Sequence, residues 1–96
     1  MRYFHRTSLG LDAVLSEADR FFGDGFTIVE TEPRRRVFEG AVGRVRVAAQ
    51  AEGGHYTLVS IETDQVGESE ADKVAKRFLS VVHSRVEPKH VVRGAY

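Results

Sequence analysis

The chain contains no cysteine and no tryptophan, and its fourteen Lys and Arg residues balance fourteen Asp and Glu residues, so it carries no net charge. The absence of cysteine excludes disulfide bonds, thiol catalysis and cysteine metal ligands. The balanced charge excludes the overall attraction that draws basic proteins to nucleic acids or to anionic membranes. We therefore expect no nucleic-acid partner, and the sequence predicts no cofactor.

Long hydrophobic runs are also missing. No apolar stretch approaches the roughly 20 residues that a membrane span requires, and the N-terminal segment MRYFHRTSLG lacks the apolar centre of a signal peptide. These observations predict a cytoplasmic protein without membrane contact. A chain of 96 residues can form one hydrophobic core but is too short for a separate catalytic lobe. We expect a single domain over residues 1–96.

Two segments have the apolar periodicity of amphipathic helices. The first covers residues 9–22, with Ser8 as the expected N-cap and Gly23 as a left-handed residue after its last turn. The second is longer and covers residues 69–87. It begins with a capping-box pattern, Ser69-x-x-Asp72, and Pro88 ends it. The apolar residues of the second helix form one stripe: Ala71, Val74, Ala75, Phe78 and Val82, with Leu79, Val81 and Val86 at its side.

The remaining segments predict strands, because they are rich in β-branched and aromatic residues and are separated by turn residues. We expect strands at residues 2–7, 26–31, 34–39, 43–51 and 55–63, followed by a tail at residues 88–96. The fold class is therefore α+β with the order β-α-β-β-β-β-α, in which one face of an antiparallel sheet packs on a long C-terminal helix and a shorter N-terminal helix. The tail, which contains Val91, Val92 and Tyr96, either returns to a sheet edge, docks on a partner subunit or frays.

Matching apolar with apolar residues and opposite charges across the hairpins predicts the strand registers. For the last hairpin, a loop of residues 52–54 pairs Val47 with Val59. For the middle hairpin, a two-residue loop pairs Phe38 with Val45. The first hairpin then pairs Ile28 with Phe38 and Glu30 with Arg36. The predicted inner face carries Phe26, Ile28, Phe38, Val45, Val47, Val59 and Ile61. The predicted outer face is polar with an apolar streak of Val29, Val37, Ala48, Tyr56 and Leu58.

This element order resembles the helix-grip architecture of START and polyketide-cyclase-like domains, and also one half of the TATA-box-binding protein. The resemblance covers nearly the whole chain but matches no motif, so it assigns no functional residues. Helix-grip proteins wrap a curved sheet around the C-terminal helix and often hold an apolar ligand between them. The TATA-binding protein kinks DNA with apolar wedges on the open sheet face, where this chain places Glu39 and Glu62, which repel phosphate.

The charged and histidine residues predict no catalytic or metal site. The run Arg34-Arg35-Arg36 alternates between the two faces of a strand, so its guanidinium groups do not converge; we expect Arg36 to pair with Glu30 and Arg35 to join the outer-face arginines. The four histidines lack metal-ligand spacing. His5 and His55 become neighbours if the first strand borders the last, and we interpret His83 as a partner of the helix dipole. The acidic patch of Asp64, Glu68, Glu70 and Asp72 is explained mainly by helix capping.

Two non-enzymatic hypotheses come first, and a cyclase-like enzyme comes third. The first is a binding or assembly domain that self-associates, as a homodimer, through the outer sheet face or its edge, with Val29, Val37, Tyr56 and Leu58 in the interface. The second is a reduced helix-grip domain that binds a small apolar ligand between the sheet and the C-terminal helix. Its candidate ligand-binding residues are Tyr3, His55 and Thr57. A cyclase-like enzyme requires a polar residue inside that pocket, and the same three residues are its only candidates.

Overall fold

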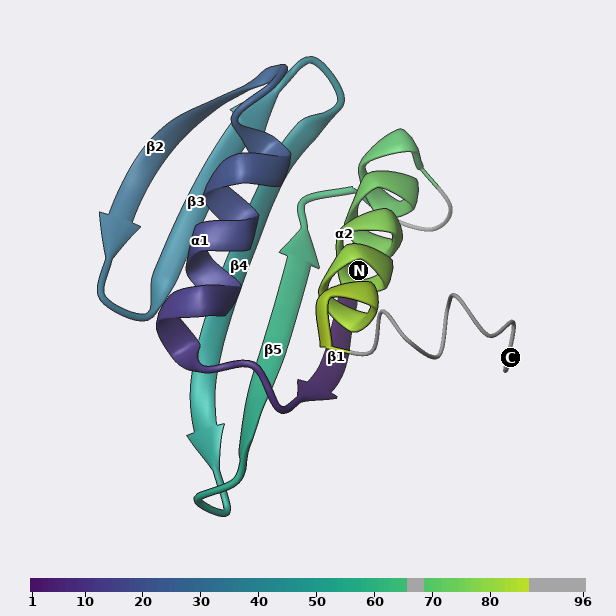
Figure 1. Cartoon of the computed structure of the whole chain (residues 1–96). Coiled ribbons are helices and arrows are strands. Elements are labelled where there is room, and N and C mark those ends of the chain that lie inside the picture. The colour runs from purple at the N-terminus through teal and green to yellow at the C-terminus, as the bar shows by residue number, and fades with distance from the viewer. Residues whose placement is uncertain (66–68, 87–96) are drawn as a thin grey trace.

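The computed structural model describes residues 1–65 and 69–86, and side chains up to residue 85. Its elements are β1 (Arg2–Thr7), α1 (Leu11–Phe22), β2 (Phe26–Glu32), β3 (Arg35–Gly40), β4 (Gly43–Glu52), β5 (Tyr56–Thr63) and α2 (Glu70–Val86). The strands form one antiparallel five-stranded sheet in the order β1-β5-β4-β3-β2 (Figure 1). The predicted α+β class and element order are confirmed.

Both helices lie on the same face of the sheet (Figure 1). The shorter helix, α1, packs on β3 and β4, whereas α2 packs on β1, β5 and β4. The edge strand β2 extends beyond α1, so the inner side of this strand is only partly covered. Within the described residues, no element covers the opposite face of the sheet. The molecule therefore has two layers, with a buried inner sheet face and an open outer one.

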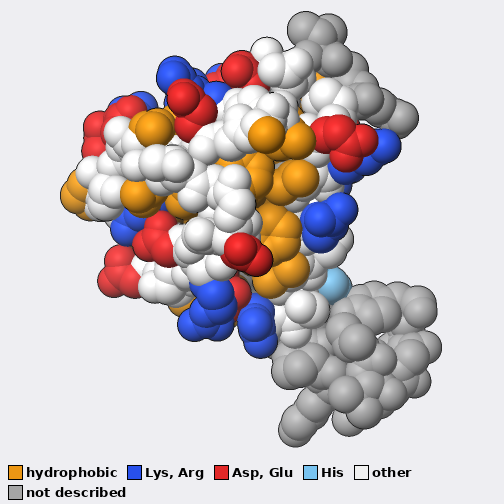
Figure 2. All heavy atoms as spheres, turned by 90° about the horizontal axis from the view of Figure 1, so that it is seen from above, with side chains coloured by type: hydrophobic (Ala, Val, Ile, Leu, Met, Phe, Trp, Pro, Cys, Tyr) orange, Lys and Arg blue, Asp and Glu red, His pale blue; other side chains and the backbone are white. Residues whose placement is uncertain are grey.

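Phe22, the last residue of α1, lies at the centre of the core. Its ring stacks on Phe38 of β3 at 4.8 Å between centroids and lies 5.4 Å from the ring of Phe78 of α2. It also meets Phe21 and Phe26 edge to face. Seen from one end, hydrophobic side chains gather in the middle of the molecule and charged groups surround them (Figure 2). One aromatic cluster therefore joins both helices to the sheet.

The helix ends differ from the prediction in two places. Gly10, not Ser8, is the N-cap of α1, because the Thr7 hydroxyl accepts a hydrogen bond from the Leu9 N–H and the chain turns before the helix begins. After α1, Gly23 keeps a helical φ of −63°, and Gly25 takes the left-handed conformation with φ 101°. At α2, the Ser69 hydroxyl accepts the Asp72 N–H at 3.1 Å, as the capping pattern predicts. The predicted end at Pro88 and the tail lie outside the described residues.

Of the three predicted hairpin registers, one is confirmed, one is shifted and one holds only in part. The β3–β4 pairing is confirmed, with Phe38 opposite Val45. The β4–β5 pairing is shifted by two residues, so that Val47 lies opposite Ile61 and the loop is 53–55 instead of 52–54. In the first hairpin Ile28 does lie opposite Phe38, but a β-bulge leaves Val29 without a partner. Because of this bulge, Glu30 faces Val37 instead of Arg36.

The inner face nevertheless agrees closely with the prediction, because a shift of two residues leaves every side chain on the same face. Six of the seven predicted residues contribute to the core; the exception is Ile28, which is 45% exposed on the edge strand β2. Sequence reasoning left the inner side of the first strand open. The structure places Thr7 in the buried layer, with Tyr3 and His5 partly buried beside it, and turns Phe4 outward.

Candidate functional site

The open outer face of the sheet is the candidate functional site. Lateral neighbours across the strands form rows, because the paired residues of adjacent strands point to the same side. The first row runs from β1 to β2 and contains Arg2, Glu62, Arg46, Val37 and Glu30. The second row also runs from β1 to β2 and contains Phe4, Ser60, Ala48, Arg35 and Glu32. The third row runs from β1 to β4 and contains Arg6, Leu58 and Gln50. This geometry places residues of β1 beside residues of β5, which are far apart in the sequence.

The second row contains a hollow. Its floor is made by the small residues Ser60 and Ala48, whereas Phe4 rises on one side and Arg35 on the other. Two adjoining cavities of about 390 and 270 Å³ share these four residues and open to solvent. Phe4 is 59% exposed, the highest exposure of any large hydrophobic side chain in the described chain. A folded chain that exposes an aromatic ring beside such a hollow has a surface that a partner can cover.

Ion pairs surround the hollow. Glu62 accepts hydrogen bonds from Arg2 at 2.9 Å and from Arg46 at 2.7 Å, and both guanidinium groups lower the pKa of this carboxyl, with Arg2 as the main cause. Arg35 donates to Glu30 and to Glu32. The Nε atom of Arg35 is buried and donates no hydrogen bond within the described residues. The rim is therefore charged but locally neutralised.

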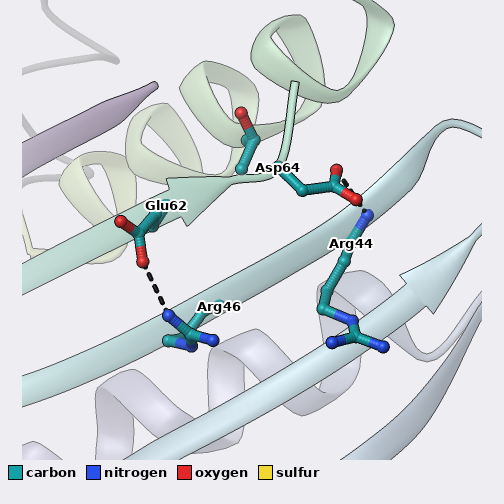
Figure 3. Close-up of a pocket in the computed structure, with 5 residues that line it drawn as sticks. Arg44, Arg46, Glu62 and Asp64 are labelled. Carbon is teal, nitrogen blue, oxygen red and sulfur yellow. Dashed lines mark hydrogen bonds and ion pairs between the residues drawn. The ribbon is translucent and has the colours of Figure 1, made fainter. Parts of the chain in front are cut away.

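A polar notch of about 280 Å³ adjoins this face at the ends of β4 and β5 (Figure 3). The Asp64 carboxylate accepts the backbone N–H of Arg44 at 3.0 Å, and this hydrogen bond is the main reason that the pKa of Asp64 is lowered. The guanidinium of Arg44 points away from Asp64 and pairs with Glu39. The four charged groups of the notch thus already have partners within the chain, and the notch itself supplies no unpaired group for a ligand.

The structure places the predicted interface residues unevenly. Tyr56 is 52% exposed, Val29 is 50% exposed at the bulge, and Leu58 is partly exposed beside the hollow. Val37 is only 3% exposed, because it lies between the long side chains of Glu30 and Arg46. Val37 therefore offers no contact surface.

Phe4 is the residue that sequence reasoning missed. The alternation of β1 separates Phe4 from Tyr3 and His5 but does not say which side faces the core, and both sides carry an aromatic residue. The buried Thr7 at the end of the same strand belongs to the inner set. The signal that could have placed Phe4 outside is that it shares its side of the strand with Arg2 and Arg6. Two arginines on one side of a strand indicate that this side faces solvent.

The predicted ligand-binding residues do not come together. Tyr3 lies opposite Ile61 near one end of β1, whereas Thr57 lies opposite Thr7 at the other end and donates its hydroxyl hydrogen to the carbonyl of Leu9. His55 is exposed in the turn between β4 and β5. Each residue has a local environment of its own, and no pocket is lined by all three.

Tyr3 instead contacts α2. Its hydroxyl donates a hydrogen bond to Asp72, and Lys76 lies 3.3 Å from the other carboxylate oxygen and 5.4 Å from the centre of the Tyr3 ring. The hydrogen bond raises the pKa of Tyr3 and lowers the pKa of Asp72, because it favours the neutral phenol and the ionised carboxylate. These contacts fix the first turns of α2 on β1.

The histidines also differ from expectation. β1 does border β5, but His5 lies opposite Val59, and its ring meets that of His83 on α2 at 6.0 Å, not that of His55. His83 therefore packs against β1 instead of only capping the helix end. Burial lowers the pKa of His5, and His83 adds to this effect. No group of three or more metal-ligating side chains occurs within residues 1–65 and 69–85.

The arginine run is divided between the two faces, as its alternation predicts. Arg36 pairs with Asp19 of α1 at 3.2 Å instead of with Glu30, because the bulge in β2 moves Glu30 toward Arg35. Arg34 is exposed in the turn before β3.

The described side chains beneath α2 are buried. Phe38, Phe78 and Val82 are at most 1% exposed, and α2 contributes no residue to the cavities described above. An apolar notch of about 320 Å³ lies beside β2 and is lined by Asp19, Gly23, Phe26, Ile28 and Phe38.

No protein-family model matches this chain, and no curated protein matches it. Among the described helices, none has the length and apolar character needed to cross a membrane.

Proposed function

We propose that the chain is a non-enzymatic assembly domain whose outer sheet face binds a second copy of itself. The observation that carries this proposal is the hollow between Phe4 and Arg35 on a sheet whose other face is already covered by two helices. Burying the exposed ring of Phe4 and the nearby Leu58, together with Tyr56 farther along β5, removes apolar surface from water, which favours association. The small floor residues allow a partner's side chain to enter.

The charge of the outer face supports a second copy as the partner. The strand residues that point outward include five arginines and five glutamates: Arg2, Arg6, Arg35, Arg44 and Arg46, and Glu30, Glu32, Glu39, Glu52 and Glu62. A surface of balanced charge does not repel its own copy, whereas a surface of one sign does. The same balance disfavours a phosphate backbone as the partner.

The alternative function, an apolar ligand between the sheet and α2, has less support. A ligand site of this kind needs roughly 300 Å³ or more of concave space, and the side chains of Phe38, Phe78 and Val82 occupy the region. We keep the helix-grip resemblance as a proposal about topology. The antiparallel sheet and the long helix α2 on its inner face support it.

Sedimentation or light scattering over a wide concentration range tests the proposal. We expect the apparent mass to rise from about 10.7 kDa toward twice that value as concentration increases. Phe4→Glu should hold the chain at the monomer mass, because it places an unpaired charge in the buried interface.

Ile28→Glu is the matched control. Ile28 is also a large exposed hydrophobic residue, but it lies on the inner side of β2, so its replacement should leave self-association unchanged. A wild-type chain that stays monomeric at millimolar concentration contradicts the proposal. Equal effects of the two substitutions contradict the choice of the outer face.

A further inference from the structure

We infer that two copies of the chain pack outer face to outer face about a two-fold axis that runs along the strands, between β4 and β5. In this arrangement Glu62 of each copy faces the partner's Arg46, and Phe4 of each copy packs on the partner's Arg35. This inference rests on the proposed self-association and adds the orientation of the two sheets.

The argument begins from symmetry. In a face-to-face homodimer the two-fold axis lies in the plane of the interface. A two-fold axis along the strands leaves each row in place and reverses its order, so that β5 of one copy lies over β4 of the other and β1 lies over β3. An axis across the strands places each strand over the same strand of the partner. The first row of one copy then lies over the third row of the other.

The axis along the strands gives complementary contacts in the first two rows. In the first row, Glu62 meets the partner's Arg46, and this contact occurs twice. In the second row, the small residues Ser60 and Ala48 face each other across the axis, which permits close approach. The ring of Phe4 then reaches the partner's Arg35, where a guanidinium can stack on an aromatic face. In the third row, Leu58 faces the partner's Gln50.

The axis across the strands, placed over the hollow, brings like charges together. Arg35 then meets the partner's Arg35, and Arg2 meets the partner's Arg6. Glu62 meets the partner's Leu58, so its carboxylate loses water without gaining a cation from the partner. Like-charge contacts across an interface are strongly unfavourable. The charge pattern therefore selects the axis along the strands.

The ion pairs of Arg35 agree with this choice. Two of its guanidinium contacts, to Glu30 and Glu32, hold the group at the wall of the hollow. These pairs fix the plane of the guanidinium on which the partner's Phe4 can stack. The resulting dimer stacks two sheets whose strand axes lie within about 30° of each other. Each strand then lies over a partner strand that runs in the opposite direction, because β5 faces β4 and β1 faces β3.

Charge reversal across the inferred pair tests the orientation. We expect Glu62→Arg to weaken self-association about tenfold or more, because it sets two arginines against each other at both symmetric contacts. Arg46→Glu should weaken it similarly by opposing two glutamates. A one-to-one mixture of the two variants should restore association, because both symmetric contacts of the mixed dimer then join Arg with Glu. Sedimentation of each variant and of the mixture measures this rescue.

The outcomes separate the inference from the proposed function. If the wild-type chain never self-associates, both the proposed function and the inferred orientation are contradicted. A chain that self-associates and is disrupted by Phe4→Glu, but whose reversed variants show no rescue on mixing, keeps the proposed function and overturns the orientation. Circular dichroism checks that each variant is folded. If a reversed variant is not folded, Glu62→Gln and Arg46→Gln replace the reversed pair. Their one-to-one mixture should associate more strongly than either variant alone, because one of the two contacts of the mixed dimer still joins Glu62 with Arg46. A mixture that associates no more strongly overturns the inference.

Discussion

At the scale of single residues, Tyr3 and Asp72 show how a polar pair can anchor a helix. Asp72 is 1% exposed, so its charge depends on partners within the protein. The Tyr3 hydroxyl supplies one hydrogen bond and Lys76 supplies a positive charge. Sequence reasoning assigned Tyr3 to a ligand pocket and Asp72 to helix capping, because it could not see that the two would meet.

We predict that Tyr3→Phe destabilises the fold and raises the pKa of Asp72 toward its ordinary value, because the main cause of the lowered pKa is lost. A carboxyl whose pKa is lowered by folding stabilises the protein at pH values above its ordinary pKa, and this contribution is lost as pH falls. The difference in stability between wild type and variant should therefore be largest near neutral pH and shrink in acid. Chemical denaturation at several pH values measures it.

Tyr56→Phe is the control for this substitution. Tyr56 is half exposed on the outer face, and its hydroxyl has no intramolecular hydrogen bond among those of the described residues. Removing that hydroxyl should leave the pH dependence of stability unchanged. If Tyr3→Phe and Tyr56→Phe behave alike, the Tyr3–Asp72 contact does not stabilise α2.

At the scale of elements, the pattern of side chains predicts the face of a strand better than its register. The two β4–β5 registers differ by two residues, and both keep Val45, Val47, Val59 and Ile61 inside. What separates them is the turn, where Gly53 and Gly54 both adopt positive φ, 64° and 77°. The predicted register assigned a bulge to one glycine and placed residues 52–54 in the loop, whereas the loop is 53–55. Similarly, the bulge at Val29 has no glycine or proline to mark it.

The packing of α2 on β1 should depend on pH through His5. Burial and the neighbouring His83 lower the pKa of His5, so the unfolded chain binds this proton more readily than the folded chain. Stability should therefore fall as pH drops below about 6.5, the ordinary pKa of histidine, until His5 is protonated in the folded protein as well. His5→Gln should reduce this loss, as measured by urea midpoints between neutral and mildly acidic pH.

His55→Gln provides the comparison, because His55 is exposed in the turn between β4 and β5. We expect this substitution to leave the slope of stability against pH as it is in the wild type. A slope that is unchanged by His5→Gln would show that the His5–His83 contact does not govern the acid response.

At the scale of the whole molecule, the sequence predicts the layers but not the functional surface. The inner face and both helices follow from apolar periodicity, since burial of apolar surface dominates folding. The hollow depends on the arrangement of Phe4, Ser60, Ala48 and Arg35, which come from four strands and lie side by side only through the sheet order β1-β5-β4-β3-β2. No local pattern in the sequence contains that order.

The single aromatic cluster leads to a prediction about the whole fold. Phe22 is fully buried and contacts aromatic rings from α1, α2, β2 and β3, so its removal should affect all of these elements together. We expect Phe22→Ala to lower the free energy of unfolding by about 3–5 kcal/mol, the usual cost of deleting a buried aromatic side chain. This is a large part of the free energy of unfolding of a typical protein, which is roughly 5–15 kcal/mol. Phe22→Leu, which leaves a smaller cavity, should cost less.

Cooperativity distinguishes one shared core from two separately packed halves. If α1 and α2 depend on the same cluster, far-UV circular dichroism and tyrosine fluorescence should give the same denaturation midpoint in wild type and in Phe22→Leu, because a two-state transition looks alike to every probe. The chain has three tyrosines, so the fluorescence compared is the part that is lost in Tyr3→Phe. This part reports on the β1–α2 side of the molecule, whereas Phe22 lies at the end of α1. A midpoint for tyrosine fluorescence that stays at the wild-type value while the helical signal shifts would mean that the two helices pack on the sheet independently.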